Sequence, residues 1–199
     1  MSATMSSTYN AGSTVTDSSN QPPITLTPTM EKYVLHWGEM GTRWGVNRSV
    51  AQVHALLHLS SDPLPAEEIA ETLGLARSNV STAIKELQGW GLIRVSRQLK
   101  DRRDHFTAER DLFEVVRLVV EGRRNREFLP TISAVEGAAD LAATDGKTPD
   151  EVAKRMKETL EIMQMFDTWY SQMARLPRGT QLSMLKLGAK IAKYLPKSG

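Results

Sequence analysis

The stretch that decides the fold is residues 67–106, EEIAETLGLARSNVSTAIKELQGWGLIRVSRQLKDRRDHF. Apolar residues at Ile69, Ala70 and Leu73 recur with the 3.6-residue period of an α-helix, which predicts a short helix with one buried stripe. Gly74 ends this helix, because glycine accepts the left-handed backbone conformation of a C-cap. In order, the stretch therefore predicts a helix, a glycine turn, a second helix, a strand and a basic hairpin.

The second helix, from about Arg77 to Gln88, is predicted to turn a polar face outward. Val80, either Ala83 or Ile84, and Leu87 fall on the inward side at helical spacing. A helix fits the major groove of DNA, and a face of small hydroxyls, an amide and two cations suits close approach to base edges and phosphates. The expected DNA contacts of this helix are Arg77, Ser78, Asn79, Ser81, Thr82 and Lys85.

An alternative for this face needs no nucleic acid. The serine and asparagine side chains would then only cap the start of the helix, and the other polar residues would form a solvated surface. The basic hairpin that follows at once favours DNA contact instead. Asn79 and Ser81 are the expected base contacts.

Positive charge is concentrated in the second helix and the hairpin. Between Arg77 and Asp104 there are seven basic and three acidic side chains, a net charge of +4, whereas the whole chain carries +2. A basic two-stranded wing beside the helix can reach the DNA backbone or the minor groove. Arg102 is the expected wing tip, because a guanidinium oriented by the neighbouring Asp101 carboxylate would enter a narrow minor groove preorganised. The expected wing contacts are Arg97, Lys100, Arg102 and Arg103.

The composition excludes several other kinds of protein. Of the 199 residues, 40% are hydrophobic and 24% are charged, which is ordinary for a globular protein. The absence of cysteine excludes disulfides, zinc–thiolate sites and a thiol nucleophile. The apolar runs are too short to span a membrane and no secretory signal is present, so a cytoplasmic protein is expected. No catalytic or phosphate-binding motif occurs, so neither an enzyme nor a cofactor is expected.

The chain divides into three predicted regions. Residues 1–28 are rich in serine and threonine with almost no charge, which predicts a disordered tail. Residues 29–128 are predicted to form a winged helix-turn-helix domain that includes an N-terminal helix and a helix after the wing, and residues 129–199 a helical dimerisation region. The fold class is mainly α with a small β wing, framed by N- and C-terminal dimerisation helices. The predicted framing helices are residues 29–44, 48–60, 108–128, 149–176 and 181–194.

These motifs resemble the MarR superfamily of winged-helix regulators and, within it, the GbsR-like branch. The resemblance rests on IAETLGLARSNVSTAIKELQGWGLI, on the wing motif DRRDHFTAERDLF at 101–113 and on RRNREFLP at 123–130, and it covers about residues 29–195. It implies a transcriptional repressor or regulator that binds operator DNA as a homodimer. In the GbsR-like branch it also implies genes for compatible solutes such as glycine betaine, with choline as an effector type. Ala76 departs from the Ser or Thr cap that is common there, so either Ser78 caps the helix or its start is loose.

Three aromatic residues on one predicted helix face suggest where an effector would bind. Tyr33, Trp37 and Trp44 could form a cage that attracts a quaternary ammonium, such as choline or a betaine, through cation–π interactions. Aromatic residues at helical spacing also form protein cores and dimer interfaces, and that alternative remains open here.

A histidine pair and an arginine cluster could each bind a ligand or have a simpler structural role. His54 and His58 lie four residues apart on one predicted helix, where both imidazoles could meet one metal ion, but no third ligand is evident and no metal is expected. Arg123, Arg124 and Arg126 form a basic turn that could support phosphate contacts, a solvated helix face or ion pairs between subunits.

The sequence therefore predicts a sequence-specific DNA-binding regulator that acts as a homodimer on an inverted-repeat operator. Two recognition helices related by a two-fold axis would lie about one DNA turn, ~34 Å, apart. The alternative is a winged helix used as a protein-interaction or general chromosome-binding module, in which the wing is mainly a phosphate tether. Specificity separates the two, because a regulator should prefer its operator over random duplex by about 1,000-fold or more at physiological salt.

Overall fold

The computed structural model describes residues 24–99 and 101–191. Intramolecular contacts divide the chain into two units, one up to Val120 and one from Glu121, which we call the winged unit and the helical unit. This division falls inside the segment 29–128 that the sequence predicted as one domain. Most of the predicted tail and Lys100 lie outside the described residues, although Ile24 and Leu26 are described and pack against the core of the winged unit.

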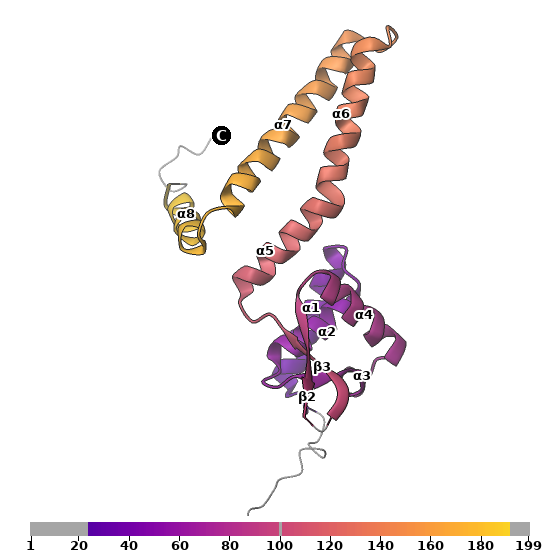
Figure 1. Ribbon diagram of the computed structural model, residues 1–199, viewed down its shortest axis with the longest axis vertical. Coiled ribbons are helices and arrows are strands. Elements are labelled where there is room, and N and C mark those ends of the chain that lie inside the picture. The colour runs from indigo at the N-terminus through magenta and orange to yellow at the C-terminus, as the bar shows by residue number, and fades with distance from the viewer. Residues whose placement is uncertain (1–23, 100, 192–199) are drawn as a thin grey trace, which may run out of the picture. The chain divides into compact units, whose positions relative to one another are not determined.

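The predicted fold class is confirmed in the winged unit, where helices lie beside a small antiparallel sheet (Figure 1). The strand order of this sheet is β1-β3-β2. The wing strand β3 continues to Ala108, so the following helix begins at Leu112, later than the sequence predicted. The elements are α1 Pro28–Arg43, α2 Arg48–Leu59, β1 Leu64–Pro65, α3 Ala66–Leu73, α4 Arg77–Gly89, β2 Ile93–Gln98, β3 Asp101–Ala108 and α5 Leu112–Arg123, which crosses into the helical unit.

The core of the winged unit is formed where α2, α3 and α4 meet. Val53, Leu56 and Ile69 are completely buried, and Val80 of α4 joins them. Gly41 allows α1 to approach α2 closely, since a Cβ at this position would lie only 2.5 Å from the Cβ of Ala51. Because one face of α4 is used by this core, its opposite face is left at the surface.

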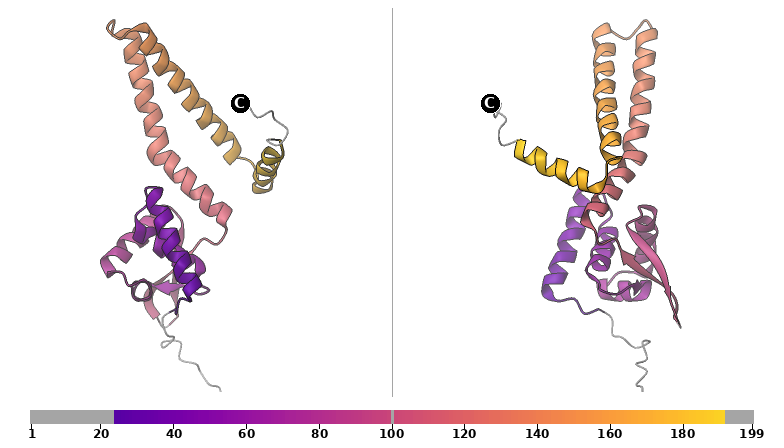
Figure 2. Two further views of the ribbon diagram at one scale, coloured as in Figure 1. Left: turned by 180° about the vertical axis from the view of Figure 1, so that it is seen from behind. Right: turned by 60° about the vertical axis from the view of Figure 1, so that its left-hand side comes forward.

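The turn between the two helices and the wing after them both lie where the sequence predicted them. Gly74 has a φ of 61°, the left-handed conformation predicted for the C-cap of α3. Strand β3 pairs with both β1 and β2, and its register with β2 shifts between Arg97 and Gln98. The β2–β3 hairpin is the wing, and it extends away from the helices of its unit (Figure 2).

The helical unit is built around two long helices that pack side by side, α6 and α7, in every view (Figures 1 and 2). Among its described residues only Ala142 is buried. Its elements are the π-helical turn η2 Arg124–Phe128, α6 Leu129–Thr144, α7 Asp150–Ala174 and α8 Arg178–Ile191.

Helix α6 was not predicted, because Pro130 was expected to end a helix. Pro130 instead lies in the first turn of α6, directly after the π-helical turn that joins α6 to α5. The π-helical turn before it widens the backbone, and the N–H of Leu129 bonds to the carbonyl of Arg124. A helical path therefore continues past a residue that ordinarily interrupts one.

Candidate nucleic-acid interface

Helix α4 presents the polar face that the sequence predicted. Val80, Ala83, Ile84 and Leu87 are buried, so both alternatives for the third apolar position pack inward. All six residues expected to contact DNA are exposed, namely Arg77, Ser78, Asn79, Ser81, Thr82 and Lys85. The small polar side chains lie on the early turns of the helix, which leaves room for another surface to come close to the backbone there.

The start of α4 has no side-chain cap. Ala76 is the N-cap residue, and neither it nor Ser78 accepts a capping hydrogen bond among the described residues. Ser78 therefore does not cap the helix in place of Ala76, and the start of α4 is the loose one that the sequence allowed. Backbone N–H groups of the first helical turn ordinarily need such an acceptor, and phosphate oxygens are suitable acceptors.

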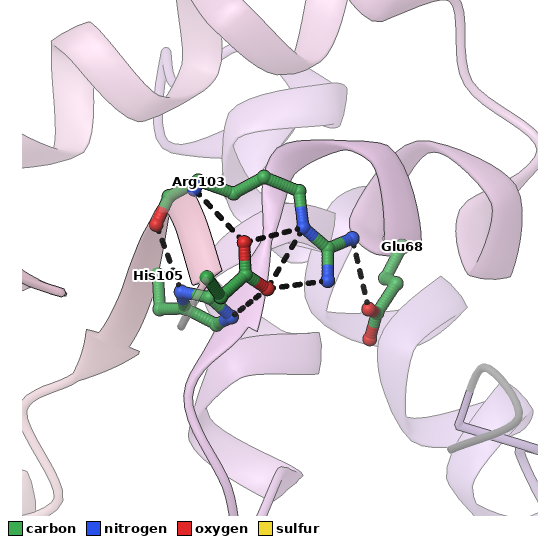
Figure 3. A network of polar contacts seen from close by, with 4 residues as sticks. Glu68, Arg103 and His105 are labelled. Carbon is green, nitrogen blue, oxygen red and sulfur yellow. Dashed lines mark hydrogen bonds and ion pairs between the residues drawn. The ribbon is translucent and has the colours of Figure 1, made fainter. Parts of the chain in front are cut away.

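A carboxylate and a guanidinium organise the wing (Figure 3). Arg103 donates from Nη2 to Oδ2 of Asp101 at 2.7 Å, and from Nε to Oδ2 at 3.0 Å and Oδ1 at 3.1 Å. Its backbone N–H also bonds to Oδ1 of Asp101 at 2.9 Å, and its Nη1 reaches Glu68 on α3 at 3.4 Å. Asp101 thus holds Arg103, and Arg103 in turn contacts the first helix of the helix-turn-helix.

This contact corrects one sequence expectation, in which Asp101 oriented Arg102. Successive side chains of a strand point to opposite faces, so Asp101 shares its face with Arg103 and not with its immediate neighbour. Arg102 is exposed, and within the described part of the chain it has no hydrogen bond or ion pair. The residue whose guanidinium is preorganised is therefore Arg103.

The pair is strongly biased toward its charged form. The hydrogen bonds from the side chain and then the backbone of Arg103 hold the pKa of Asp101 at about 2, below its ordinary value of 3.8. Arg103 is still 43% exposed, so its guanidinium can meet a further anion. His105 is buried, and its Nδ1 donates a hydrogen bond to the carbonyl oxygen of Arg103 at 3.0 Å, which helps to fix the backbone of β3 there.

The other wing cations are exposed and are held loosely. Arg97 bonds from Nε to Oδ1 of Asp104 across the hairpin at 3.3 Å, with both side chains largely in solvent. Arg94, which the sequence did not single out, pairs with Glu109 at 2.8 Å. The Arg97–Asp104 pair is exposed on both sides and contributes little to folding, so Arg97 can exchange its partner for a phosphate at low cost, whereas the Glu109 partner of Arg94 is only 18% exposed.

Two of the three aromatic residues of the predicted effector cage meet on α1. The rings of Tyr33 and Trp37 stack with centroids 5.5 Å apart, and Trp37 stacks in turn on His54 of α2 at 6.3 Å. Trp44 is exposed at the C-cap of α1 and does not line this layer. The enclosed space beside the layer has a volume of about 10 Å³, which holds at most one water molecule.

The two histidines are part of this same layer. His54 is buried, and its Nε2 has no hydrogen-bond partner in the described structure. Burial, and then the neighbouring His58, lower the pKa of His54 from 6.5 to about 4. The Nδ1 of His58 lies 3.3 Å from the carbonyl oxygen of Glu109. No cluster of three or more metal-binding side chains occurs among the described residues.

The basic turn of the helical unit is paired within the chain. Arg124 bonds to Asp167 of α7 at 2.7 and 3.0 Å and to the hydroxyl of Ser171 at 3.1 Å, and it lies 5.6 Å from the centre of the Tyr170 ring. The hydrogen bonds to Asp167 raise the pKa of Arg124. This arginine therefore fixes η2 to α7.

Helix α7 also carries an apolar stripe that is more than half exposed in the described structure. Ile162, Met165, Phe166 and Trp169 are spaced i, i+3, i+4, i+7, and each is between 52% and 59% exposed. From Ile162 to Ala174 the only charged side chain is Asp167, which Arg124 neutralises. An uncharged helix face with large apolar side chains is typical of the centre of a protein interface.

Comparisons with known proteins agree with this architecture. Residues 44–104 match the sequence model of the MarR family. No helix in the described part of the chain is both long enough and apolar enough to cross a membrane. A solved structure described as a transcriptional regulator has a TM-score of 0.50 and 21% sequence identity, and the match covers 73% of this chain and 95% of that one.

The fold and the family model together define the class as far as residues 44–104 reach: this segment is a winged helix-turn-helix domain of the MarR type. The resemblance predicted from the wing and helix motifs is confirmed. Among individual proteins, the chain is similar to the HTH-type transcriptional repressor GbsR of Bacillus subtilis (strain 168). The two are 24% identical over 160 residues, which cover 77% of this chain and 83% of the relative.

Proposed function

We propose that this regulator represses transcription by binding an inverted-repeat operator as a homodimer. The observation that carries the proposal is the exposed face of α4, with its small polar residues, beside a wing whose arginines are exposed. An α-helix and a basic hairpin at neighbouring positions can occupy a major groove and the adjacent minor groove of one duplex. A protein acting on the chromosome would work in the cytoplasm.

On α4 the residues divide by chemistry. The amide of Asn79 and the hydroxyl of Ser81 can pair with base edges, while Ser78 and Thr82 are short enough to let the helix approach. Arg77 and Lys85 lie nearer the two ends of the exposed face and suit phosphates. Phosphate oxygens can also accept from the N–H groups of the first turn, where no side-chain cap is present.

On the wing, Arg103 is the proposed minor-groove contact. A guanidinium already fixed by a carboxylate loses less conformational entropy when it enters a narrow groove than one that is free in solution. Arg97 and Arg102 are exposed and suit the phosphates on either side of the groove. Lys100, also expected there, lies outside the described residues.

The apolar stripe of α7 is the proposed contact between two copies. Its four large side chains need cover, and an uncharged face meets its own copy without electrostatic repulsion. A two-fold dimer then presents two α4 helices to one face of the duplex. Within the predicted C-terminal dimerisation region, 129–199, α7 would then make the contact between the two copies.

A quaternary-ammonium solute such as choline or a betaine is the proposed effector, with compatible-solute genes as the regulated class. The class of effector comes from the GbsR-like resemblance, and the stacked Tyr33 and Trp37 supply the aromatic surface that it requires. The space beside them holds one water at most, so binding needs the layer to open. Choline and glycine betaine at millimolar concentration should then change both tryptophan fluorescence and operator affinity.

The test is selection of bound duplexes from a random DNA pool, followed by binding of the winner and of a scrambled control across a salt series. The proposal predicts an enriched inverted repeat that is bound about 1,000-fold or more tighter than the scrambled duplex. Equal, steeply salt-dependent binding to every duplex would favour a general chromosome-binding module. No binding to any duplex would favour a protein-interaction module.

A further inference from the structure

A leucine occupies the turn of the wing, where polar residues are usual. Leu99 lies between β2 and β3 and is 93% exposed, the largest fraction among the large apolar side chains whose exposure the structure describes. Tight turns favour glycine, asparagine, aspartate and serine, because these residues suit turn backbones and solvent. An aliphatic side chain kept in water forgoes the stabilisation that burial would give it. Leu99 therefore makes no contribution to the fold that would explain its position.

The surroundings of Leu99 point to an anionic partner. The strands that lead to and from the turn carry Arg97, Arg102 and Arg103, all exposed, so the leucine lies at the end of a hairpin with cationic side chains on it. The register shift between Arg97 and Gln98 is an irregularity of the kind that redirects side chains at the end of a hairpin. A single leucine within a cationic rim is far smaller than the apolar patch that a stable protein partner would need.

We propose that Leu99 is an apolar wedge that enters the minor groove of the bound duplex. This inference rests on the proposed DNA-binding function and adds a contact of a different kind to it. Arg97 and Arg102 pair with the phosphates that border the groove, and Leu99 packs against sugars and base edges in the groove beside Arg103. Insertion of an aliphatic side chain at a base step partly unstacks that step and bends the duplex toward the major groove. Leu99 then favours operators with a deformable step under the wing.

The decisive variant is Leu99→Gln, which keeps the size of the side chain but makes it polar. Because the residue is exposed, the thermal unfolding of this variant should match the wild type. Leu99→Met keeps an apolar wedge of similar volume and should behave as the wild type does. Val95→Thr on β2, the strand that leads to the turn, is the matched control, since Val95 is 49% exposed but lies away from the turn.

The experiment uses the full chain on the duplex that the wild type selects from the random pool. End-to-end fluorescence energy transfer reports the bend, and 2-aminopurine at the step under each wing reports unstacking. The wild type, Leu99→Met and Val95→Thr should all bend the duplex and raise the 2-aminopurine signal. Leu99→Gln should lose most of both signals and bind about tenfold more weakly. Its salt dependence should keep the wild-type slope, because no phosphate contact is removed.

Each other result overturns the wedge in a recognisable way. If Leu99→Gln bends the duplex and binds it as the wild type does, the wedge is wrong while the proposed function stands. The wedge is also wrong if the loss of affinity comes with a smaller salt slope, because Leu99 would then act only through the placement of the arginines. If the wild type prefers no duplex in the pool, the proposed function itself fails, and the wedge falls with it.

Discussion

The winged unit and the helical unit bury their apolar residues to very different extents. In the winged unit, Val53, Leu56 and Ile69 are completely shielded from solvent, whereas the helical unit buries only Ala142 among its described residues. Two packed helices leave most of each helix surface outside their contact, so large side chains such as Phe166 remain exposed. One unit therefore has a core of its own, whereas the other leaves its apolar side chains exposed, as the proposed contact between two copies requires.

The largest effect should come from a truncation in the core. Leu56→Ala removes a fully buried side chain and should lower the free energy of unfolding of the winged unit by about 2–5 kcal/mol. Leu141→Ala truncates an exposed leucine of α6 and should change the free energy of unfolding by less than about 0.5 kcal/mol. Urea denaturation at two protein concentrations measures both. Equal losses would contradict the contrast between the units.

The winged unit should also lose stability in mild acid. Unfolding returns the pKa of His54 from about 4 to 6.5, so between these values the unfolded chain binds a proton that the folded one does not. The contribution is complete above pH 6.5 and is lost as pH falls to 4, by about 3 kcal/mol. Denaturation across this range should show the slope. His54→Phe should remove it, and the exposed His36→Gln should keep it; an unchanged slope in His54→Phe would assign the effect elsewhere.

In the helical unit the expected effect is on association. Trp169→Ala removes a large side chain from the exposed stripe of α7 and should weaken self-association by about 30-fold, with the stability of the winged unit unchanged. Lys157→Ala changes an exposed side chain of the same helix outside the stripe and is the matched control. Sedimentation equilibrium measures both dissociation constants. If Trp169→Ala associates as tightly as the control, the stripe is not the contact between copies.

The smallest effect separates two adjacent wing arginines. Arg103→Gln and Arg102→Gln should each reduce the salt slope of DNA binding by about one unit, because each removes one phosphate or groove contact. Arg103→Gln should cost more affinity, since only Arg103 is preorganised by Asp101. Binding isotherms between low and moderate salt concentration measure both the salt slope and the loss of affinity. Equal losses would mean that the carboxylate contributes nothing to DNA binding.

The sequence predicted features that depend on short-range periodicity. The outward face of α4 followed from the spacing of Val80 and Leu87, and the left-handed Gly74 followed from its place after an apolar stripe. The pairing of Asp101 with Arg103 could also have been predicted from the sequence, because residues two apart in a strand lie on the same face. The prediction assigned Arg102 instead, because sequence adjacency was used where the pleat of the strand decides.

Other features depend on tertiary packing that periodicity does not contain. Helix α6 was missed because the π-helical turn that accommodates Pro130 has no sequence signal of its own. Burial of His54 arises where α1 crosses α2, and the small space beside Trp37 depends on the same crossing. The periodicity of residues 149–176 predicted a helix but not which of its apolar residues would be exposed, and Phe166 is exposed because one neighbouring helix covers only part of a wide apolar arc.

Hydroxyl-radical footprinting of the selected duplex maps where both copies touch one DNA. A dimer on an inverted repeat should give two symmetric sets of protected sugars, with centres about one helical turn apart, and added minor-groove protection where each wing lies. Trp169→Ala should lose the paired pattern at concentrations where the wild type gives it. A single protected patch, or uniform protection along the duplex, would contradict a dimeric regulator that reads an inverted repeat.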